Sequence, residues 1–261
     1  SSTVQFTVNV SALVVTVESP LNQSYFNLTW IWGNATTNKP AIACNYSLDN
    51  GANITMNNDT ATHWYANVSG LSEGGHNITY YCEEYETGNI SQSDYSYFTI
   101  DLTTPSLVLV SPQNTTYSTL TIHLNYSASD EHAITCYYFN DTYPYVEIPG
   151  CQNKTLTFTA DGTHVVGVKV VDVAGNINAT QVTFTIDTTP PLITVLSPQN
   201  ITYATSSVWF NVTTSENASA CWYRLNEGSN ITMNKYNNTY FYRLNNPVSY
   251  THLTLPTTER V

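Results

Sequence analysis

The sequence predicts an all-β fold, in which seven-stranded sandwiches follow one another in tandem and the last one is truncated. The first observation is composition, because only 10% of the residues are charged and Tyr occurs 20 times. β-branched and aromatic residues alternate with Gly, Pro and Asn clusters roughly every eight to twelve residues, which is typical of β-sandwiches. The second observation is an internal repeat, and the third is strict alternation of apolar and polar residues within short segments.

One phrase occurs twice without a gap, at Phe98–Tyr117 and at Phe184–Tyr203, and a weaker copy lies at Phe6–Pro20. Its Ser-Pro pairs recur roughly every ninety residues, the length of a small domain. In each copy an alternating strand runs into a linker, and where Pro stands in it, its fixed φ and missing N–H stop sheet pairing, so the phrase predicts a domain boundary. The predicted segments are 1–11 (last strand of a preceding repeat whose body is missing from this fragment), 12–104 (repeat 1), 105–190 (repeat 2), 191–247 (truncated repeat 3) and 248–261 (non-native tail).

The middle repeat displays its strands most clearly. Within Leu120–Tyr126, for example, Ile122 and Leu124 alternate with Thr121 and His123, which predicts one face in the core and one in solvent. The seven predicted strands of this repeat are Leu107–Val110, Leu120–Tyr126, Ile134–Phe139, Val146–Ile148, Leu156–Thr159, Val165–Val171 and Val182–Ile186.

This pattern resembles the tandem immunoglobulin-like or fibronectin type III-like repeats of bacterial and archaeal cell-surface proteins. The resemblance rests on the seven short strands and on a closing D-x-A-G-N hairpin (Asp172–Asn176), followed by a strand and a joint (Asp187–Pro191). It covers nearly the whole chain. The resemblance implies architecture rather than one function, because such repeats serve as stalks, wall layers, adhesins and spacers.

The same resemblance suggests a calcium site. In some related repeats a hairpin Asp and a linker Asp share Ca²⁺ between domains, which here implies Asp172, Asn176 and Asp187 as oxygen ligands. The alternative is that the hairpin is a plain turn, in which the Asp side chain bonds its own backbone. No other cofactor is expected.

N-linked glycans are the partners that the sequence favours most. It contains roughly twenty N-x-[ST] motifs, whereas chance would give about seven. Several lie on the outward parity of predicted strands, where a glycan would meet solvent. The predicted sites are Asn9, Asn22, Asn27, Asn34, Asn45, Asn53, Asn58, Asn67, Asn77, Asn89, Asn114, Asn125, Asn140, Asn153, Asn178, Asn200, Asn211, Asn217, Asn230 and Asn237.

The cysteines favour an oxidising, extracellular location. Cys44 and Cys82 both lie on predicted strands with inward parity, and a bridge between them is expected. Cys136 aligns with Cys44, but Val170 stands where Cys82 would be, so Cys151 is the expected partner. Four cysteines allow three pairings, so this connectivity stays an inference.

The third repeat ends abruptly. Cys221 matches Cys44, yet no cysteine follows about forty residues later, as the first bridge would require. The tail Val248–Val261 departs from the repeat pattern and resembles a translated sequencing adapter, so we exclude it from fold reasoning. Since Leu253 and Leu255 are its main apolar residues, the tail is not expected to complete the sandwich, which should make the third repeat the least stable.

Catalysis has little support, and the chain is not expected to be an enzyme. No nucleophile elbow, H-E-x-x-H motif or glycine-rich phosphate loop is present. His76 and His164 align just before the sixth strand, where a structural role is expected. The acidic pairs Glu83–Glu84 and Asp130–Glu131 are interpreted as solvated charges.

The tryptophans leave a second function open. Most fall on parities expected of core residues, so a platform for sugar stacking is not favoured. With seven Lys and Arg and a net charge of −12, nucleic acid is not an expected partner, and no membrane span is expected in this fragment. The function expected is an extracellular spacer or structural segment of a glycosylated surface protein, contacting like repeats of neighbouring chains or surface carbohydrate. The alternative is an adhesin or carbohydrate-binding module, which could be joined to a hydrolase outside this fragment.

Overall fold

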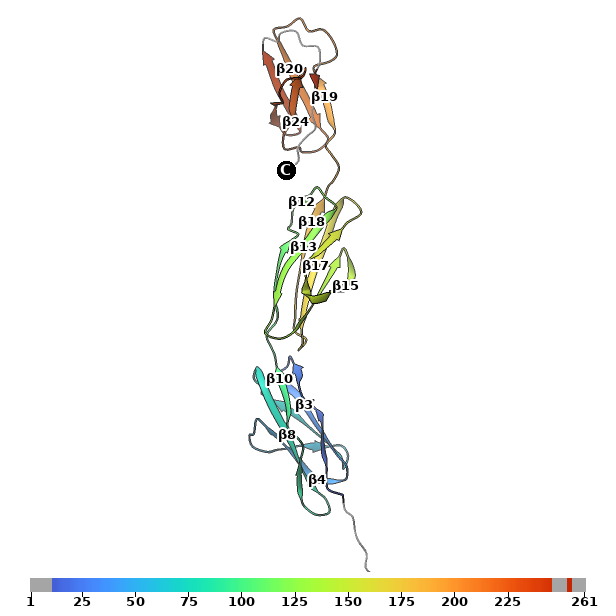
Figure 1. Ribbon diagram of the computed structural model, residues 1–261, viewed down its shortest axis with the longest axis vertical. Coiled ribbons are helices and arrows are strands. Elements are labelled where there is room, and N and C mark those ends of the chain that lie inside the picture. Colours follow the sequence, from blue (N-terminus) through green and yellow to red (C-terminus); the bar gives the residue numbers. More distant parts are fainter. Residues whose placement is uncertain (1–10, 246–252, 255–261) are drawn as a thin grey trace, which may run out of the picture. The chain divides into compact units, whose positions relative to one another are not determined.

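The structure is a computed structural model that describes residues 11–245 and 253–254 (Figure 1). Within these residues it consists of β-strands and one short 3-10 turn, without an α-helix, so the predicted all-β class is confirmed. The chain forms two compact units: the first holds repeats 1 and 2 apart from residues 117–120, and the second holds those four residues and the chain from Ile186 on.

The first repeat is a sandwich of two sheets. One sheet has the strand order β1-β3-β7-β6, and the other has the order β2-β10-β8-β4-β5 with β9 beside β8. All pairs are antiparallel except β2 with β10. The strands are β1 (Val15–Ser19), β2 (Ser24–Phe26), β3 (Trp30–Thr37), β4 (Ala41–Leu48), β5 (Ile54–Thr55), β6 (Asn57–Asn58), β7 (His63–Ser69), β8 (Gly74–Glu84), β9 (Ile90–Gln92) and β10 (Ser96–Ile100).

A buried tyrosine ties the two sheets of this sandwich together. The Tyr80 hydroxyl, on β8, donates to the Ser19 carbonyl at the end of β1 over 2.5 Å. Burial raises the pKa of Tyr80, so the group remains a protonated donor at neutral pH. Glycine is required at position 33 on β3, because a Cβ there would lie 2.8 Å from the Tyr80 hydroxyl oxygen.

The second repeat has the same two-sheet plan. Its sheets have the orders β11-β13-β16 and β12-β18-β17-β14-β15. Its core includes Leu124, Val168 and Phe184. Its elements are β11 (Ser106–Ser111), β12 (Thr116–Tyr117), β13 (Thr121–Ser129), β14 (Ile134–Asn140), β15 (Thr142–Ile148), the 3-10 turn η1 (Pro149–Cys151), β16 (Lys154–Thr157), β17 (Gly162–Asp172) and β18 (Ile177–Ile186).

All seven strands predicted for this repeat are present, but several have other bounds. For example, β15 begins at Thr142 rather than at Val146, and β17 begins at Gly162 rather than at Val165. β18 begins at Ile177 rather than at Val182, because the half-buried positions of its first half are the polar residues Asn178 and Thr180, which give no apolar alternation. The additional strand β12 is only two residues long and was not predicted.

Both expected disulfides are formed. Cys44 and Cys82 stand directly opposite each other on β4 and β8. Cys136 on β14 faces Val170 on β17 and bonds instead to Cys151 in the 3-10 turn. The alignment that placed Val170 in the position of Cys82 is therefore confirmed.

In the part of the chain that the structure describes, the third repeat has fewer strands than the other two. Its sheets have the orders β19-β20-β24-β23 and β22-β21-β25. Phe210, Tyr223 and Tyr240 are at the centre of its core. Its described strands are β19 (Ile193–Ser197), β20 (Ser207–Thr214), β21 (Trp222–Leu225), β22 (Ile231–Thr232), β23 (Asn234–Tyr236), β24 (Thr239–Asn245) and β25 (Leu253–Thr254).

The tail is not expected to complete this sandwich, and among the described residues it contributes one strand of two residues. Leu253 and Thr254 pair with Leu225 and Arg224 of β21, in the place that the sixth strand occupies in the complete repeats. Backbone N–H and C=O groups at an unpaired edge accept any extended segment, whatever its side chains. The rest of 248–261 lies outside the described residues.

Cys221 remains a free and buried thiol. Burial raises its pKa, and the charge of Lys235 offsets this only in part, so little reactive thiolate forms at neutral pH.

Loss of the two disulfides should cost different amounts of stability. Replacing Cys44 and Cys82 together by Ser should lower the free energy of unfolding by about 4 kcal/mol, and replacing Cys136 and Cys151 by about 3 kcal/mol, since the bridges close separations of 38 and 15 residues. Urea unfolding followed by hydrogen exchange in each repeat measures both losses. Equal losses would contradict this loop-length explanation.

Gly167→Ala should destabilise the second repeat by about 1–3 kcal/mol. The added Cβ would lie 2.1 Å from the ring of Phe139, which is buried and stacked on Tyr143 with ring centroids 4.5 Å apart. Gly75→Ala on β8 is the matched control, because no atom lies within 4 Å of its added Cβ. Urea midpoints of the two variants compare the effects, and a similar midpoint for both would refute the steric argument.

Candidate functional site

The first joint centres on Asp101, which follows directly after β10. This residue is only 2% exposed. Its N–H donates to the Phe26 carbonyl over 2.9 Å, and its Oδ1 accepts a hydrogen bond from the Thr103 N–H over 3.1 Å. The linker therefore leaves the first repeat in a fixed local conformation.

Three side chains of the second repeat bind this linker. Asn176 donates from Nδ2 to the Asp101 carbonyl over 2.8 Å, and Asn178 donates to the Pro105 carbonyl over 2.9 Å. His132, in the loop between β13 and β14, places Nδ1 2.8 Å from Oδ2 of Asp101. The joint is thus a set of specific contacts rather than a free linker.

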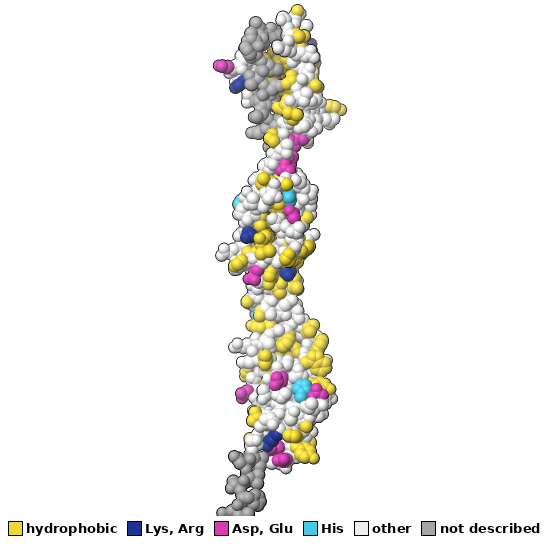
Figure 2. Space-filling model, turned by 90° about the vertical axis from the view of Figure 1, so that its right-hand side faces the viewer, with side chains coloured by type: hydrophobic (Ala, Val, Ile, Leu, Met, Phe, Trp, Pro, Cys, Tyr) yellow, Lys and Arg dark blue, Asp and Glu magenta, His cyan; other side chains and the backbone are white. Residues whose placement is uncertain are grey.

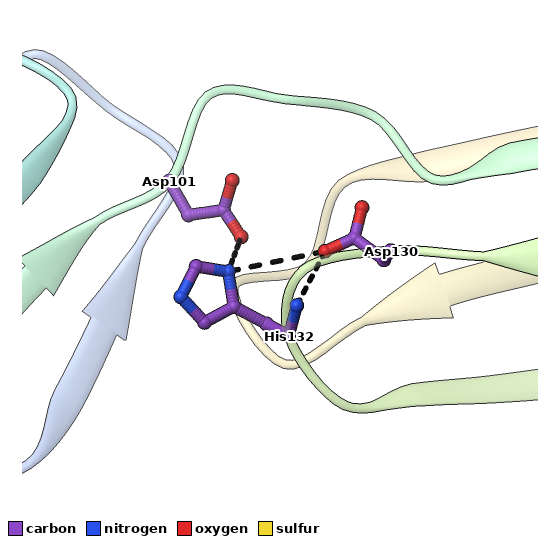
Figure 3. Close-up of side chains that lie close together, drawn as sticks. All are labelled: Asp101, Asp130 and His132. Carbon is purple, nitrogen blue, oxygen red and sulfur yellow. Dashed lines mark hydrogen bonds and ion pairs between the residues drawn. The ribbon is translucent and has the colours of Figure 1, made fainter.

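Figure 3 shows how the carboxylates of Asp101 and Asp130 approach one ring nitrogen of His132. Oδ1 of Asp130 accepts a hydrogen bond from the His132 backbone N–H over 2.9 Å and lies 3.8 Å from the ring nitrogen. The close pair between His132 and Asp101 is not an aligned hydrogen bond, because neither of these two buried atoms has a hydrogen-bond partner. When the imidazole is protonated, the contact is therefore an ion pair between the partly exposed His132 ring and two buried carboxylates.

The same three side chains offer one nitrogen and two oxygen donors within 4.8 Å of one another. Among the described residues this is the only group of three His, Cys, Asp or Glu side chains so arranged. The donor set suits Zn²⁺ better than Ca²⁺, which prefers six to eight oxygens. However, the pair distance of 2.8 Å already allows direct pairing without an ion.

The predicted calcium ligands do not form one set. Asp172 accepts hydrogen bonds from the Gly175 and Asn176 N–H groups over 2.7 and 2.9 Å, which is the plain turn considered as the alternative. Asp187 follows the far end of β18, a strand of 10 residues that spans about 33 Å. The linker aspartate that meets the Asp172–Asn176 hairpin is Asp101, from the joint before the repeat rather than the joint after it.

The equivalent loops of the other repeats also contact the joint that precedes them. In the first repeat, Asn38 accepts from the Val14 N–H and Lys39 donates to the Ser11 carbonyl. In the third repeat, Ser215 accepts from the Leu192 N–H over 2.9 Å. The position is thus used three times, each time with different side chains.

Two acids interpreted as solvated charges are in fact buried. The carboxylate of Asp130 belongs to the cluster at the first joint, and its side chain is 3% exposed. Glu84 is also buried and forms an ion pair with Lys39. Lys39 is distant in sequence from Glu84, and Asp101 is distant from Asp130, so the adjacent acidic residues alone gave no signal of burial.

The two aligned histidines have the same structural role. Nδ1 of His76 lies 2.7 Å from Asp49, and Nδ1 of His164 lies 2.8 Å from Asp141, while the other ring nitrogen of each contacts a backbone carbonyl. Burial lowers the pKa of His76, but the hydrogen bond to Asp49, the Ser72 carbonyl and the Asp49 charge outweigh it, and the pKa is raised. These contacts fix the start of β8 and β17, as expected.

The interpretation of most tryptophans as core residues is wrong. Trp30, Trp32 and Trp209 are 40%, 48% and 47% exposed, Trp222 is half-buried, and only Trp64 is buried. In Figure 2 hydrophobic side chains reach the surface in each repeat, with few charged side chains among them. The outer sheet faces therefore carry aromatic rings that the core does not use.

The predicted glycosylation sites all lie at accessible positions within the described residues. From residue 11 to residue 245, each asparagine of an N-x-[ST] motif is exposed or half-buried. Asn9 lies outside the described residues. Accessibility is what a glycan requires.

Comparison with known proteins gives one family match and several structural matches. Residues 109–188 match the family model described as "Bacterial Ig-like domain". No curated protein matches the chain. The family match lies within the second repeat, and the sheets described above have the Ig-like or fibronectin type III-like sandwich plan that the resemblance implied.

Three of the matching structures are tandem-domain proteins of low identity. The fibronectin(III)-like modules of Clostridium thermocellum CbhA match at 16% identity and a TM-score of 0.46, over 66% of this chain and 94% of theirs. A tetra-tandem repeat from the extending region of a large adhesion protein matches at 18% and 0.28, over 88% of this chain and 64% of its own. The FN1–FN3 domains of chicken CNTN1 match at 11% and 0.31, over 95% and 98%.

The described part of the chain also contains no helix that is both long and apolar enough to cross a membrane.

The contacts at the first joint should restrict motion between repeats 1 and 2. In the double variant Asn176→Ala, Asn178→Ala, the two repeats should tumble more independently, because both hydrogen bonds to the linker carbonyls are lost. ¹⁵N relaxation measures this as a shorter rotational correlation time for each repeat. Asn153→Ala is the control, since this side chain bonds the Tyr126 N–H within the second repeat. Unchanged correlation times in the double variant would show that these bonds do not hold the joint.

Proposed function

We propose that this chain is an extracellular segment of an N-glycosylated surface protein, in which tandem Ig-like repeats act as a spacer. The observation that carries the proposal is the first joint. A spacer needs successive domains held in a defined relation, and side chains of the second repeat hydrogen-bond to two carbonyls of the linker.

Two further features support an extracellular location. Two disulfides join strands or turns within the first two repeats, and disulfides persist mainly in oxidising compartments. The dense N-x-[ST] motifs are accessible throughout the described residues, which suits a secreted glycoprotein.

Carbohydrate binding is the second candidate, and one observation favours it. Trp30 and Trp32 lie side by side on the outer face of β3, with ring centroids 6.4 Å apart. Exposed aromatic rings of this kind stack on sugars, as they do in adhesins and carbohydrate-binding modules. An enzyme lying elsewhere in a longer protein would be compatible with either candidate.

Production in a secreting, glycosylating host tests the proposal. The purified chain should migrate well above its polypeptide mass of 29.0 kDa and return towards it on enzymatic deglycosylation. Without reductant, only Cys221 among the five cysteines should be open to alkylation after denaturation. A chain whose five thiols all alkylate would refute the extracellular location, and a chain whose asparagines are unmodified would refute the N-glycosylation. Tight binding of the deglycosylated chain to a polysaccharide would favour the second candidate instead.

A further inference from the structure

On the outer sheet face of the first repeat, two aromatic rings each stand two residues before the asparagine of an N-x-[ST] motif. Trp32 precedes Asn34 by two residues on β3, and Tyr65 precedes Asn67 by two residues on β7. In a strand, residues two apart share a face. Each ring therefore lies next to a glycosylation motif on the outward side of the same strand.

Pairing between the strands joins these residues into one array. Trp32 stands opposite Asn67, and Asn34 stands opposite Tyr65, so rings and asparagines alternate both along each strand and across the strand pair. The rings of Trp32 and Tyr65 contact each other along one diagonal, with centroids 6.1 Å apart. We call these four residues the aromatic–asparagine face.

The third repeat carries the same spacing independently. Trp209 precedes Asn211 by two residues on β20 and is exposed. Its cross-strand neighbour is Arg243, which lies over the ring, rather than a second asparagine. The feature common to both repeats is thus the pair of residues two apart on one strand, not the cross-strand pair.

From this arrangement we infer that the first sugar of the glycan on Asn34 stacks on Trp32, and that those on Asn67 and Asn211 stack on Tyr65 and Trp209. The inference rests on the glycosylation included in the proposed function. The C–H groups of a pyranose carry partial positive charge and are attracted to the negative face of an aromatic ring. Attachment two residues away gives the sugar a high effective concentration at the ring, so even a weak contact is populated.

The same arrangement disfavours an external polysaccharide as the occupant. Asparagines 34 and 67 border the ring of Trp32 along the strand and across it. Cross-strand neighbours have Cβ atoms only about 5 Å apart, so glycans on these asparagines would cover the rings. The aromatic surface that resembles a binding platform is then covered by the chain's own glycans.

A double-mutant cycle in glycosylated protein tests the inference. Asn34→Gln should lower the urea midpoint of the first repeat when Trp32 is present, and this loss should fall by at least half in the Trp32→Ala background. Trp30→Ala is the matched control, because Trp30 is similarly exposed on the same face but has Trp32, not asparagine, two residues later. In the Trp30→Ala background the loss should be unchanged.

The same cycle is repeated in protein that has both disulfides but no glycans. It measures direct coupling between the side chains of Trp32 and Asn34, and it should show none. In the glycosylated protein, NMR should show an upfield shift of the first-sugar protons on Asn34 that is lost in Trp32→Ala. Glycopeptide mass spectrometry reports occupancy of Asn34, Asn67 and Asn211.

The outcomes separate this inference from the function on which it rests. Unmodified asparagines at these three positions would overturn both the stacking and the glycan part of the proposed function. Occupied asparagines without coupling, or with equal coupling in the two preparations, would overturn the stacking alone. Binding of a soluble polysaccharide through Trp32 in the fully glycosylated chain would also overturn it.

Discussion

Successive side chains of a β-strand point to opposite faces, and nearly every other feature of this chain depends on that alternation. On β4 it turns Cys44 towards its partner in the core and leaves Asn45 outside. On β3 it sets the rings of Trp32 and the side chain of Asn34 on one outward row. With only 10% charged residues, the outer faces have few charges to keep them soluble, so amides, hydroxyls and the proposed glycans must supply that polarity.

The joints use a different physical device. Sheet hydrogen bonding stops near Asp101, and the linker carbonyls would remain unpaired without another donor. Asn176 and Asn178 supply these donors, while the Asp172 carboxylate orients Asn176 through a second bond of 2.9 Å from its Nδ2. The Asp172–Asn176 hairpin, which connects β17 and β18, therefore stabilises the joint that precedes the second repeat.

Much of the fold could be predicted from the sequence, because periodicity and repeat spacing are local signals. The strands of the middle repeat and both disulfides were predicted in this way. The tryptophans could not be, because strand parity was interpreted with their rings on the core side, whereas on β3 the small or branched residues Ile31, Gly33 and Ala35 fill the core side. Glycine at position 33 leaves room for the Tyr80 hydroxyl, a contact between sheets that no local pattern reveals.

The site at the joint was also hard to predict, because its contacts join residues that are distant in sequence. The hairpin Asp172 could be recognised from its motif, but its linker partner depends on which end of β18 a joint occupies. That is a property of topology, so Asp187 was chosen where Asp101 is found. Likewise, Asp130 and His132 became a cluster only when Asp101, about thirty residues earlier, was placed beside them.

The loop that precedes Cys44, Cys136 and Cys221 in the three repeats has a consequence for how such a chain could be rearranged. It reads Asn38-Lys39-Pro40 in the first repeat, Asp130-Glu131-His132 in the second and Ser215-Glu216-Asn217 in the third, and each version contacts its own preceding linker. Exchanging two repeats would present Pro40 or Asn217, at the position of His132, to the Asp101 carboxylate. Repeats with a common fold thus differ in the three consecutive side chains that contact the preceding linker. These contacts favour a particular order of repeats along the chain.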